Sequence, residues 1–442
     1  MGTLMPEGLA AARILMGFAL AYHIIVAAIG VGMPFLLLAA EGMALRTGDP
    51  VWRAIARRWA RAFTALFAIG AVTGTMVAFL LGMLWPRFLE KFGPVAGIPF
   101  ALEGFAFFVE AIFLGVYLYG WDRLPPRAHW LSGIPVAAGS IGSAWLVVTA
   151  NGWMNTPQGF RMVNGRVVEV DILAALFNPA APLQAIHMIL TAWMVTGFAV
   201  AGVYAAARLR GRENRYTRRA MALALALGAV ATPLQIGSGD FLARMTARTQ
   251  PVKFAAMEGQ FRTEAGAPLR IGGIPNEKTR ETRWAVEIPG GLSFLAFRDF
   301  KAVVSGVDDV PVRDRPPVLP VHLAFQVMVG VGFSLMGLAA WAAWETWRRR
   351  GVPSGRLFLW ASVAAGPLSI LALEAGWMVT ELGRQPWVVK GLLRTSEAVT
   401  DASGAGTILW IVVVLCVLFT AGLVAALRSI AREPFPEDAH VA

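Results

Sequence analysis

The segment Glu374-Ala-Gly-Trp-Met-Val-Thr-Glu-Leu-Gly-Arg-Gln-Pro-Trp387 ends a long apolar run, yet it contains two carboxylates and an arginine. Glu374 and Glu381 are seven residues apart, which places them on one face of a helix, about 10 Å apart along its axis. A carboxyl group at membrane depth costs a few kcal/mol, so it usually has a partner and a function. The segment therefore predicts a membrane-spanning helix that carries chemistry.

The composition of the whole chain agrees with a membrane protein. Its 442 residues are 57% hydrophobic and 15% charged, whereas soluble proteins have about 25% charged residues. Apolar runs longer than about 18 residues recur, so we expect an all-α integral membrane protein in a lipid bilayer. The net charge is +11, but the arginines cluster in short loops, which argues against nucleic acid as a partner. The single cysteine, Cys416, excludes an intrachain disulfide and a cysteine-based metal cluster within the chain.

Hydropathy predicts nine transmembrane helices with approximate boundaries. The N-terminus has no basic region and no small-residue cleavage site, so the first apolar segment is expected to be retained. We expect helices 1–6 within residues 1–240, a long loop at 241–317, helices 7–9 within 318–431 and a tail at 432–442. The individual helices are expected at 9–43, 54–84, 97–120, 129–152, 183–208, 218–240, 318–347, 357–381 and 406–430.

Charge in the short loops predicts the orientation. Nineteen arginines flank the helices on one side, against seven Lys/Arg on the other, so the first side is expected to be cytoplasmic. The N-terminus is then outside and the C-terminus inside. The polar 241–317 loop lies outside by alternation, and its twelve Lys/Arg do not count because long loops are exempt from the rule. A loop of this length is expected to be functional or partly mobile.

Histidines in or beside apolar helices are candidate metal ligands. His23 is either a hydrogen-bonded interhelical residue or an axial haem ligand, since imidazole binds iron well. His187 and Met328 both lie near the outer starts of their helices, and a His/Met pair is an established axial set. Met328 is one of 17 methionines, so this signal alone is weak. His322 is expected at a helix interface, and His129 at a loop edge.

A second carboxylate pair, Glu103 and Glu110, repeats the seven-residue spacing in the third helix. Two such pairs on two helices, with His23 on a third, favour a proton path or cofactor site over a purely structural role. On the fourth helix, Ser140 and Ser143 either extend a hydrogen-bonded route or permit close packing.

Two further polar motifs lie toward the outer side. The residues of Asn151-Gly-Trp-Met-Asn-Thr-Pro157 are consistent with ordinary helix termination. In the long loop, Lys253 and Glu258 are five residues apart, and a surface ion pair is the plain interpretation. The functional alternative is a quinol headgroup site, in which a carboxylate accepts a hydroxyl proton.

Together these motifs resemble subunit I of the cytochrome bd-type quinol oxidases over nearly the whole chain. The sequence Gly-Arg-Gln-Pro-Trp after an intramembrane glutamate is specific, and so is the order of the motifs. The resemblance rests on Tyr22-His23, Leu102-Glu103-Gly104, Phe107-Phe108-Val109-Glu110, Gly120-Trp121-Asp122-Arg123-Leu124, Asn151-Gly152-Trp153-Met154-Asn155, His187, Lys253 to Glu258, Met328 and Glu374 to Trp387.

The resemblance implies three haems: a low-spin haem b, a high-spin haem b, and a haem d or a third haem b in its place. His187 and Met328 would bind the iron of the low-spin haem. His23 and Glu381 would each serve one of the two high-spin haems, in an order that the resemblance leaves open. Trp377 would either lie between haems or act in packing.

The resemblance also implies roles for polar residues around the haems. Glu103 and Glu110 would belong to the proton region, and Arg384 would lie near haem propionates. Lys253 and Glu258 would act in quinol oxidation. Family members of this kind have an arginine two residues before the methionine ligand, whereas this chain has Gln326, so the properties of the low-spin haem are open.

The implied activity is a quinol:O2 oxidoreductase of the bacterial cytoplasmic (inner) membrane, with the cyanide-insensitive branch of the family as one alternative. Ubiquinol or menaquinol would be oxidised outside and O2 reduced to water with cytoplasmic protons, which is electrogenic without pumping. The implied partners are a second membrane subunit and a small single-helix subunit. Two alternatives are a proton-coupled secondary transporter, which predicts repeat symmetry and broken helices, and a structural or assembly subunit.

Overall fold

The computed structural model describes residues 7–399 and 404–434, so most of the expected tail at 432–442 lies outside the described residues. Within them, nine helices are long and apolar enough to cross a membrane, which confirms the predicted fold class. They are α1 (Glu7–Thr47), α2 (Pro50–Leu84), α3 (Pro86–Gly120), α4 (Pro126–Asn155), α6 (Ala181–Leu209), α7 (Arg215–Thr249), α10 (Val318–Arg349), α11 (Arg356–Leu382) and α13 (Ala405–Arg432).

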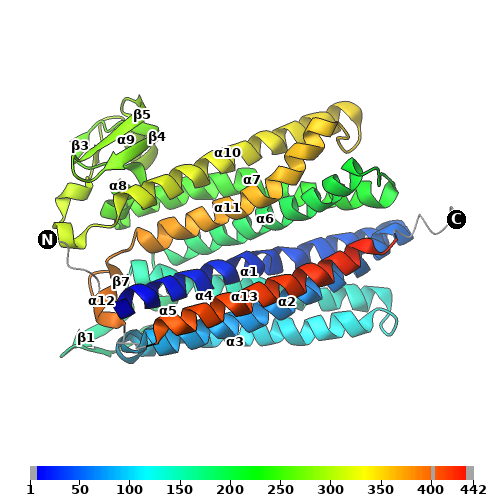
Figure 1. The fold of residues 1–442 in the computed structure, drawn as a ribbon, viewed down its shortest axis with the longest axis horizontal. Helices are drawn as coiled ribbons and strands as arrows, with labels where there is room; N and C mark the ends of the chain where they lie inside the picture. Colours follow the sequence, from blue (N-terminus) through cyan, green and yellow to red (C-terminus); the bar gives the residue numbers. More distant parts are fainter. Residues whose placement is uncertain (1–6, 400–403, 435–442) are drawn as a thin grey trace.

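The long helices run side by side along the long axis of the molecule (Figure 1). The connections that follow α1, α3, α6 and α10 lie at one end of the bundle, on the right in that view. Asp49, between α1 and α2, pairs there with Arg215 and Arg219 of α7. Arg208 of α6 donates to the carbonyl of Pro353, between α10 and α11. The arginines of separate loops therefore gather at one end.

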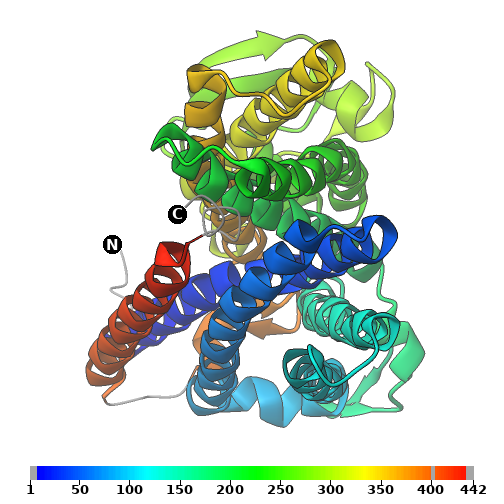
Figure 2. The ribbon, with the colours of Figure 1, turned by 90° about the vertical axis from the view of Figure 1, so that its right-hand side faces the viewer.

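The bundle consists of two groups of helices (Figure 2). One group contains α6, α7, α10 and α11, and the other contains α1 to α4 with α13. Small residues let neighbouring backbones approach closely, which strengthens packing in a membrane. A Cβ on Gly197 of α6 would lie 2.3 Å from the Gly228 nitrogen of α7. One on Gly32 of α1 would lie 2.2 Å from Thr196 Oγ1 of α6, so α1 joins the two groups.

Short elements cover the opposite end, and most belong to the long loop between α7 and α10. The strands form four antiparallel pairs, β1–β2, β3–β6, β4–β5 and β7–β8. The elements are β1 (Arg161–Val163), β2 (Arg166–Val168), α5 (Ile172–Leu176), α8 (Pro251–Glu258), β3 (Glu264–Ala265), β4 (Leu269–Asn276), β5 (Glu281–Ile288), α9 (Gly291–Phe297), β6 (Val303–Val304), the 3-10 turns Val307–Asp309 and Val312–Asp314, β7 (Trp387–Val389), β8 (Leu393–Arg394) and α12 (Thr395–Ala398).

All nine long helices extend somewhat beyond the bounds predicted from the sequence, and two of them extend much further. α3 begins at Pro86 instead of near residue 97, and α7 continues to Thr249 instead of ending near residue 240. Charged residues such as Arg87 lower the hydropathy of the first turns of α3, although Phe88 and Phe92 there are buried. Hydropathy detects only the part of a helix that matches the bilayer, so polar turns beyond it are missed.

Candidate functional site

His187 on α6 is held by two side chains of α7. Its Nδ1 lies 2.9 Å from Ser238 Oγ, and Gln235 Nε2 lies 2.9 Å from its Nε2. The Ser238 hydroxyl donates to the Gln235 carbonyl, so its oxygen accepts the Nδ1 proton of the histidine. The Nε2 atom then carries the lone pair that a metal would use. A Cβ on Gly239 would lie 3.3 Å from the ring, so glycine permits this close approach.

Met328 lies on α10, against α11. A Cβ on Gly376 would lie 2.9 Å from Met328 Sδ, so the glycine makes room for the thioether. Trp377, the next residue on α11, is partly buried. Since α6, α7, α10 and α11 pack as one group, the structure brings His187 and Met328 into the same four-helix group.

His23 on α1 has surroundings that match those of His187. Its Nδ1 lies 2.9 Å from Thr73 Oγ1 of α2, and the Thr73 hydroxyl donates to the Ile69 carbonyl. The threonine oxygen therefore accepts from the ring, and Nε2 is again the unprotonated nitrogen. A Cβ on Gly74 would lie 3.2 Å from the imidazole, so a hydroxyl and a glycine orient this ring as well.

Glu381 near the end of α11 receives two hydrogen bonds. Asn151 Nδ2 donates to its Oε1 at 2.5 Å, and Arg384 donates to its Oε2 at 2.6 Å. Arg384 is buried, and its Nε and Nη1 atoms have no partner. Glu374, two turns earlier, also has a buried Oε1 without a partner. Each unpaired buried polar atom costs about 1–3 kcal/mol, so these atoms indicate where a further polar group would bind.

A chain of hydrogen bonds connects α8 with Glu381 across the end of α4. Lys253 Nζ donates to Asn155 Oδ1 and to the Thr380 carbonyl, both at 3.2 Å. Asn155 Nδ2 donates to the carbonyl of Asn151 at 2.9 Å, and Asn151 in turn binds Glu381. Helix termination is therefore an incomplete interpretation of these asparagines, because their side chains connect two predicted site residues.

Lys253 and Glu258 are buried on α8 and form no ion pair with each other. Burial and the nearby charge of Arg384 together lower the pKa of Lys253 to about 7, against the opposing charge of Glu381. Burial raises the pKa of Glu258 to about 8, against the opposing charge of Arg270. Glu258 Oε2 has no hydrogen-bond partner. The surface ion pair considered from the sequence is absent here, and both groups can exchange protons near neutral pH.

A cavity of about 440 Å³ lies at the same end of the bundle. Phe261, three residues after Glu258, forms part of its wall together with Gln385 of the Gly-Arg-Gln-Pro-Trp motif. Arg13, Arg280 and Arg315 contribute positive charge to the lining. Volumes of about 300–1,000 Å³ are usual for small-molecule sites, so this cavity could admit a ligand between α1 and the long loop.

The carboxylates of α3 face α4. Ser143 Oγ donates to Glu103 Oε1 at 2.7 Å. Glu110 is buried, and a Cβ on Gly139 would lie 2.9 Å from its backbone nitrogen. Ser140 donates to the Ala137 carbonyl of its own helix. Of the two serines, only Ser143 has a direct contact with a carboxylate.

Comparison with known proteins identifies the family. The model of the family described as cytochrome bd terminal oxidase subunit I matches residues 11–434. The chain belongs to this family. It is 37% identical to the Bacillus subtilis (strain 168) "Putative cytochrome bd menaquinol oxidase subunit I", with 99% of each chain covered. It is 31% identical to the cytochrome bd ubiquinol oxidase subunit 1 of the same strain, covering 92% of this chain and 89% of that one.

A solved structure agrees with this assignment to the cytochrome bd oxidases. The bd oxidase of Geobacillus thermodenitrificans superposes with a TM-score of 0.92 and 38% identity, covering 97% of this chain and 99% of the matched chain. Membership in a terminal oxidase family argues against the alternative of a secondary transporter. It also argues against the alternative of a subunit with only a structural or assembly role.

The family name implies haems, and the residues of this cytochrome bd subunit fit such a group. Two imidazoles present an unprotonated Nε2, and Met328 offers a thioether, which are established haem ligands. The two unpartnered donor atoms of Arg384 suit a carboxylate such as a haem propionate. The donor set and its unpaired atoms are therefore compatible with bound haem.

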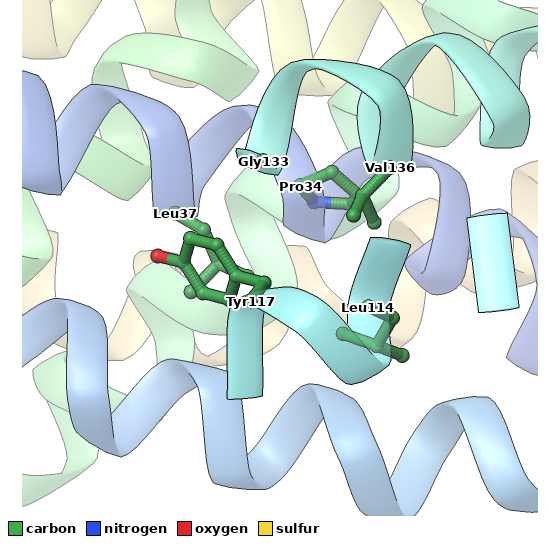
Figure 3. A pocket seen from close by; sticks show the side chains of 6 residues that line it. All are labelled: Pro34, Leu37, Leu114, Tyr117, Gly133 and Val136. Carbon is green, nitrogen blue, oxygen red and sulfur yellow. The ribbon is translucent and has the colours of Figure 1, made fainter. Parts of the chain in front are cut away.

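Sequence reasoning missed one buried cluster in this bd oxidase subunit. His129 lies in the first turn of α4, beside the preceding loop as expected, but it is only 2% exposed, with Nδ1 2.6 Å from Glu41 Oε1 and Nε2 2.8 Å from the Tyr117 carbonyl. The Tyr117 hydroxyl donates to Glu41 Oε2. Tyr117 also borders a small cavity of about 10 Å³ beside Pro34 and Leu114 (Figure 3). The sequence signal that could have indicated this cluster was Glu41, a carboxylate within an apolar run.

Proposed function

We propose that this subunit oxidises a quinol at the end of the bundle that carries α8, and that its electrons reduce O2 to water. The observation that carries the proposal is the hydrogen-bonded chain from Lys253 through Asn155 and Asn151 to Glu381. This chain of hydrogen bonds joins Lys253, a predicted residue of the quinol site, to Glu381, a predicted iron ligand. Relatives named as menaquinol and ubiquinol oxidases support a quinol as the reductant. When bound, the haems supply electron transfer and the reduction of O2.

Four residues would hold the haem irons. His187 on α6 and Met328 on α10 belong to one four-helix group, which supports them as the two residues that would hold the iron of a low-spin haem b. His23 and Glu381 would serve a high-spin haem b and a haem d, or a third haem b in its place. Arg384 would bind propionates through its two unpartnered donor atoms. Trp377 would act as an aromatic neighbour of these groups.

Residues 241–317 would form the quinol-binding loop. Glu258 would accept the proton of a quinol hydroxyl, because its pKa of about 8 is matched to transfer near neutral pH. Its buried, unpartnered Oε2 supports this role. Lys253, hydrogen-bonded to Asn155, would position the headgroup relative to Glu381. Protons from the quinol would leave on the outer side.

Protons for water formation would come from the opposite, arginine-rich end, which we assign to the cytoplasm. Glu103, Glu110 and Ser143 would hold and pass protons between α3 and α4, since Ser143 already donates to Glu103. Proton release on one side and proton uptake on the other would separate charge across the bacterial cytoplasmic membrane. The enzyme would thus be electrogenic without pumping.

The word "subunit" in the names of the relatives supports a complex with other chains. We expect a second membrane subunit and a small single-helix subunit. α13 offers a large apolar surface for lipid or for such a partner, because side chains such as Trp410, Val417 and Leu418 are exposed on it.

The first experiment is a reduced-minus-oxidised absorption spectrum of the purified oxidase, combined with haem extraction and a quinol-dependent O2 uptake assay. We expect haem signals, and replacement of His187 or Met328 by alanine should remove the low-spin signal. Met336→Ala, on the same helix, is the matched control and should leave the signal in place. Absence of haem would refute the oxidase function, whereas an unchanged low-spin signal in both ligand variants would refute only the ligand assignment.

A further inference from the structure

The β4–β5 hairpin of the long loop is hydrogen-bonded to α10 through Gln326. Gln326 Oε1 accepts from the Gly272 nitrogen, and its Nε2 donates to the Arg270 carbonyl, both at 3.0 Å. One side-chain amide thus satisfies a donor and an acceptor of β4 on either side of Ile271. This is the position at which related sequences are expected to have an arginine, which has no acceptor atom and could not form the same pair of bonds.

His322 lies one helical turn before Gln326 and contacts the same strand. Its Nε2 lies 3.0 Å from the Gly272 carbonyl, and its Nδ1 lies 2.8 Å from the Met257 carbonyl at the end of α8. The ring is fully buried. Residues four apart share a helix face, so His322 and Gln326 together present one polar surface of α10 to α8 and β4.

Two glycines with positive φ angles let the backbone pass close to this polar surface. Gly259, directly after α8, has φ +63°, and a Cβ there would lie 3.2 Å from His322 Nδ1. Gly273 has φ +94°, and a Cβ there would lie 2.8 Å from the Thr282 methyl group. Glycine adopts such backbone angles more readily than any other residue. The chain therefore turns sharply on both sides of the histidine.

The same contacts fix the surroundings of Glu258. Met257, whose carbonyl faces His322, is the residue before Glu258. Arg270, whose carbonyl accepts from Gln326, pairs through its side chain with Glu287 and contacts Gln260. The Arg270 charge also acts on Glu258. Movement of the hairpin away from α10 would therefore displace both the Glu258 backbone and a cation whose charge acts on Glu258.

We propose that His322 and Gln326 are positioning residues that hold the β4–β5 hairpin against α8 and so set the affinity of the quinol site. The inference rests on the proposed function, because it assigns Glu258 to quinol binding. Gln326 acts through the hairpin and not through the haem, although Met328 is only two residues away on α10.

The test uses the complete oxidase as isolated from membranes, with the variants Gln326→Leu, Gln326→Glu and His322→Gln. Trypsin cleavage at Lys278, Arg280 and Arg283, which are exposed in and beside the hairpin turn, reports on the hairpin without any need for activity. Gln326→Leu loses both hydrogen bonds to β4, so it should raise the rate of cleavage about tenfold. The KM for a soluble quinol should rise by a similar factor, while kcat and the low-spin haem spectrum stay close to wild type.

The control is Ser334→Ala on the same helix, because this exposed hydroxyl bonds only to the Gly330 carbonyl. It should change neither cleavage nor KM. Gln326→Glu keeps the acceptor and loses the donor, so it remains informative if Gln326→Leu does not fold. Cleavage at the wild-type rate in all three variants would overturn the proposal, as would a lower kcat with an altered haem spectrum at unchanged KM. A wild-type enzyme that does not oxidise quinol would refute the proposed function, yet the cleavage rates would still test the hairpin contacts.

Discussion

Glu258 is the residue whose charge state matters most directly for the proposed reaction. A general base must be deprotonated before it can accept a proton. Burial raises the pKa of Glu258 to about 8, so the carboxyl is mostly protonated at pH 6 and gains its charge as the pH rises through 8. Its activity as a base should therefore increase with pH.

We predict that kcat/KM for quinol oxidation rises about tenfold between pH 6 and pH 7 and levels off above pH 8, since kcat/KM follows the free enzyme. Glu258→Gln should remove this rise and lower the rate by about 10²–10⁴-fold. The measurement is O2 uptake with a soluble quinol after subtraction of the enzyme-free rate.

The titration of Lys253 must be distinguished from that of Glu258 in this experiment, because the pKa of Lys253 is about 7 and falls in the same pH range. Lys253→Met should be slower than wild type yet keep the rise with pH. If Lys253→Met loses the rise and Glu258→Gln retains it, the lysine and not the glutamate is the titrating group.

At the scale of elements, α10 and α11 meet where Gly376 leaves space for Met328. A Cβ would lie 2.9 Å from Met328 Sδ, which is closer than atoms normally approach, so one of the two helices or the thioether must shift. Gly376→Ala should therefore weaken or shift the low-spin haem signal. Gly337→Ala on α10 is the control, because no atom lies within 4 Å of the position of its Cβ. Equal spectra in the two variants would show that Met328 is not constrained by this contact.

The elements also show what could be predicted from the sequence. The nine long helices were predictable because bilayer thickness imposes a length and a composition on each span. The β4–β5 hairpin was not, since its strands lie within a polar loop and are partly exposed, and Gly272 and Gly273 interrupt the pattern of β4. The contact of Asn151 with Glu381 joins residues 230 apart in the chain, and no local pattern encodes it. His23, His187 and Met328 were candidate ligands from their positions in apolar helices, and Glu381 became one through the family resemblance. The hydroxyl groups of Thr73 and Ser238 that orient the two histidines required the structure.

For the molecule as a whole, the two ends of the bundle differ in their short elements, which Figure 1 shows gathered at one end, and in the number of arginines in their turns. One end has short arginine-rich turns, and the other carries the strands and short helices. The positive-inside rule assigns the first end to the cytoplasm. In the proposed function, this orientation would determine on which side quinol protons are released and on which side protons for water are taken up.

Protease accessibility tests the orientation. Trypsin added to cells without an outer barrier should cut the β4–β5 turn near Arg280, whereas inverted vesicles should be cut at the turn that contains Arg210 and Arg212. Both turns have exposed basic residues, so each serves as the control for the other. The reverse pattern would place quinol oxidation on the cytoplasmic side and contradict the proposed charge separation.

The burial of Lys253 and Glu258 has a consequence for how the protein is made. In the proposed orientation, the segment from residue 250 to residue 317 must pass through the translocation machinery as an unfolded chain. Its partners His322 and Gln326 belong to α10, which is synthesised later. The proposed quinol site would therefore assemble only after export of the loop and insertion of the following helix, which makes its formation a late step in the synthesis of the subunit.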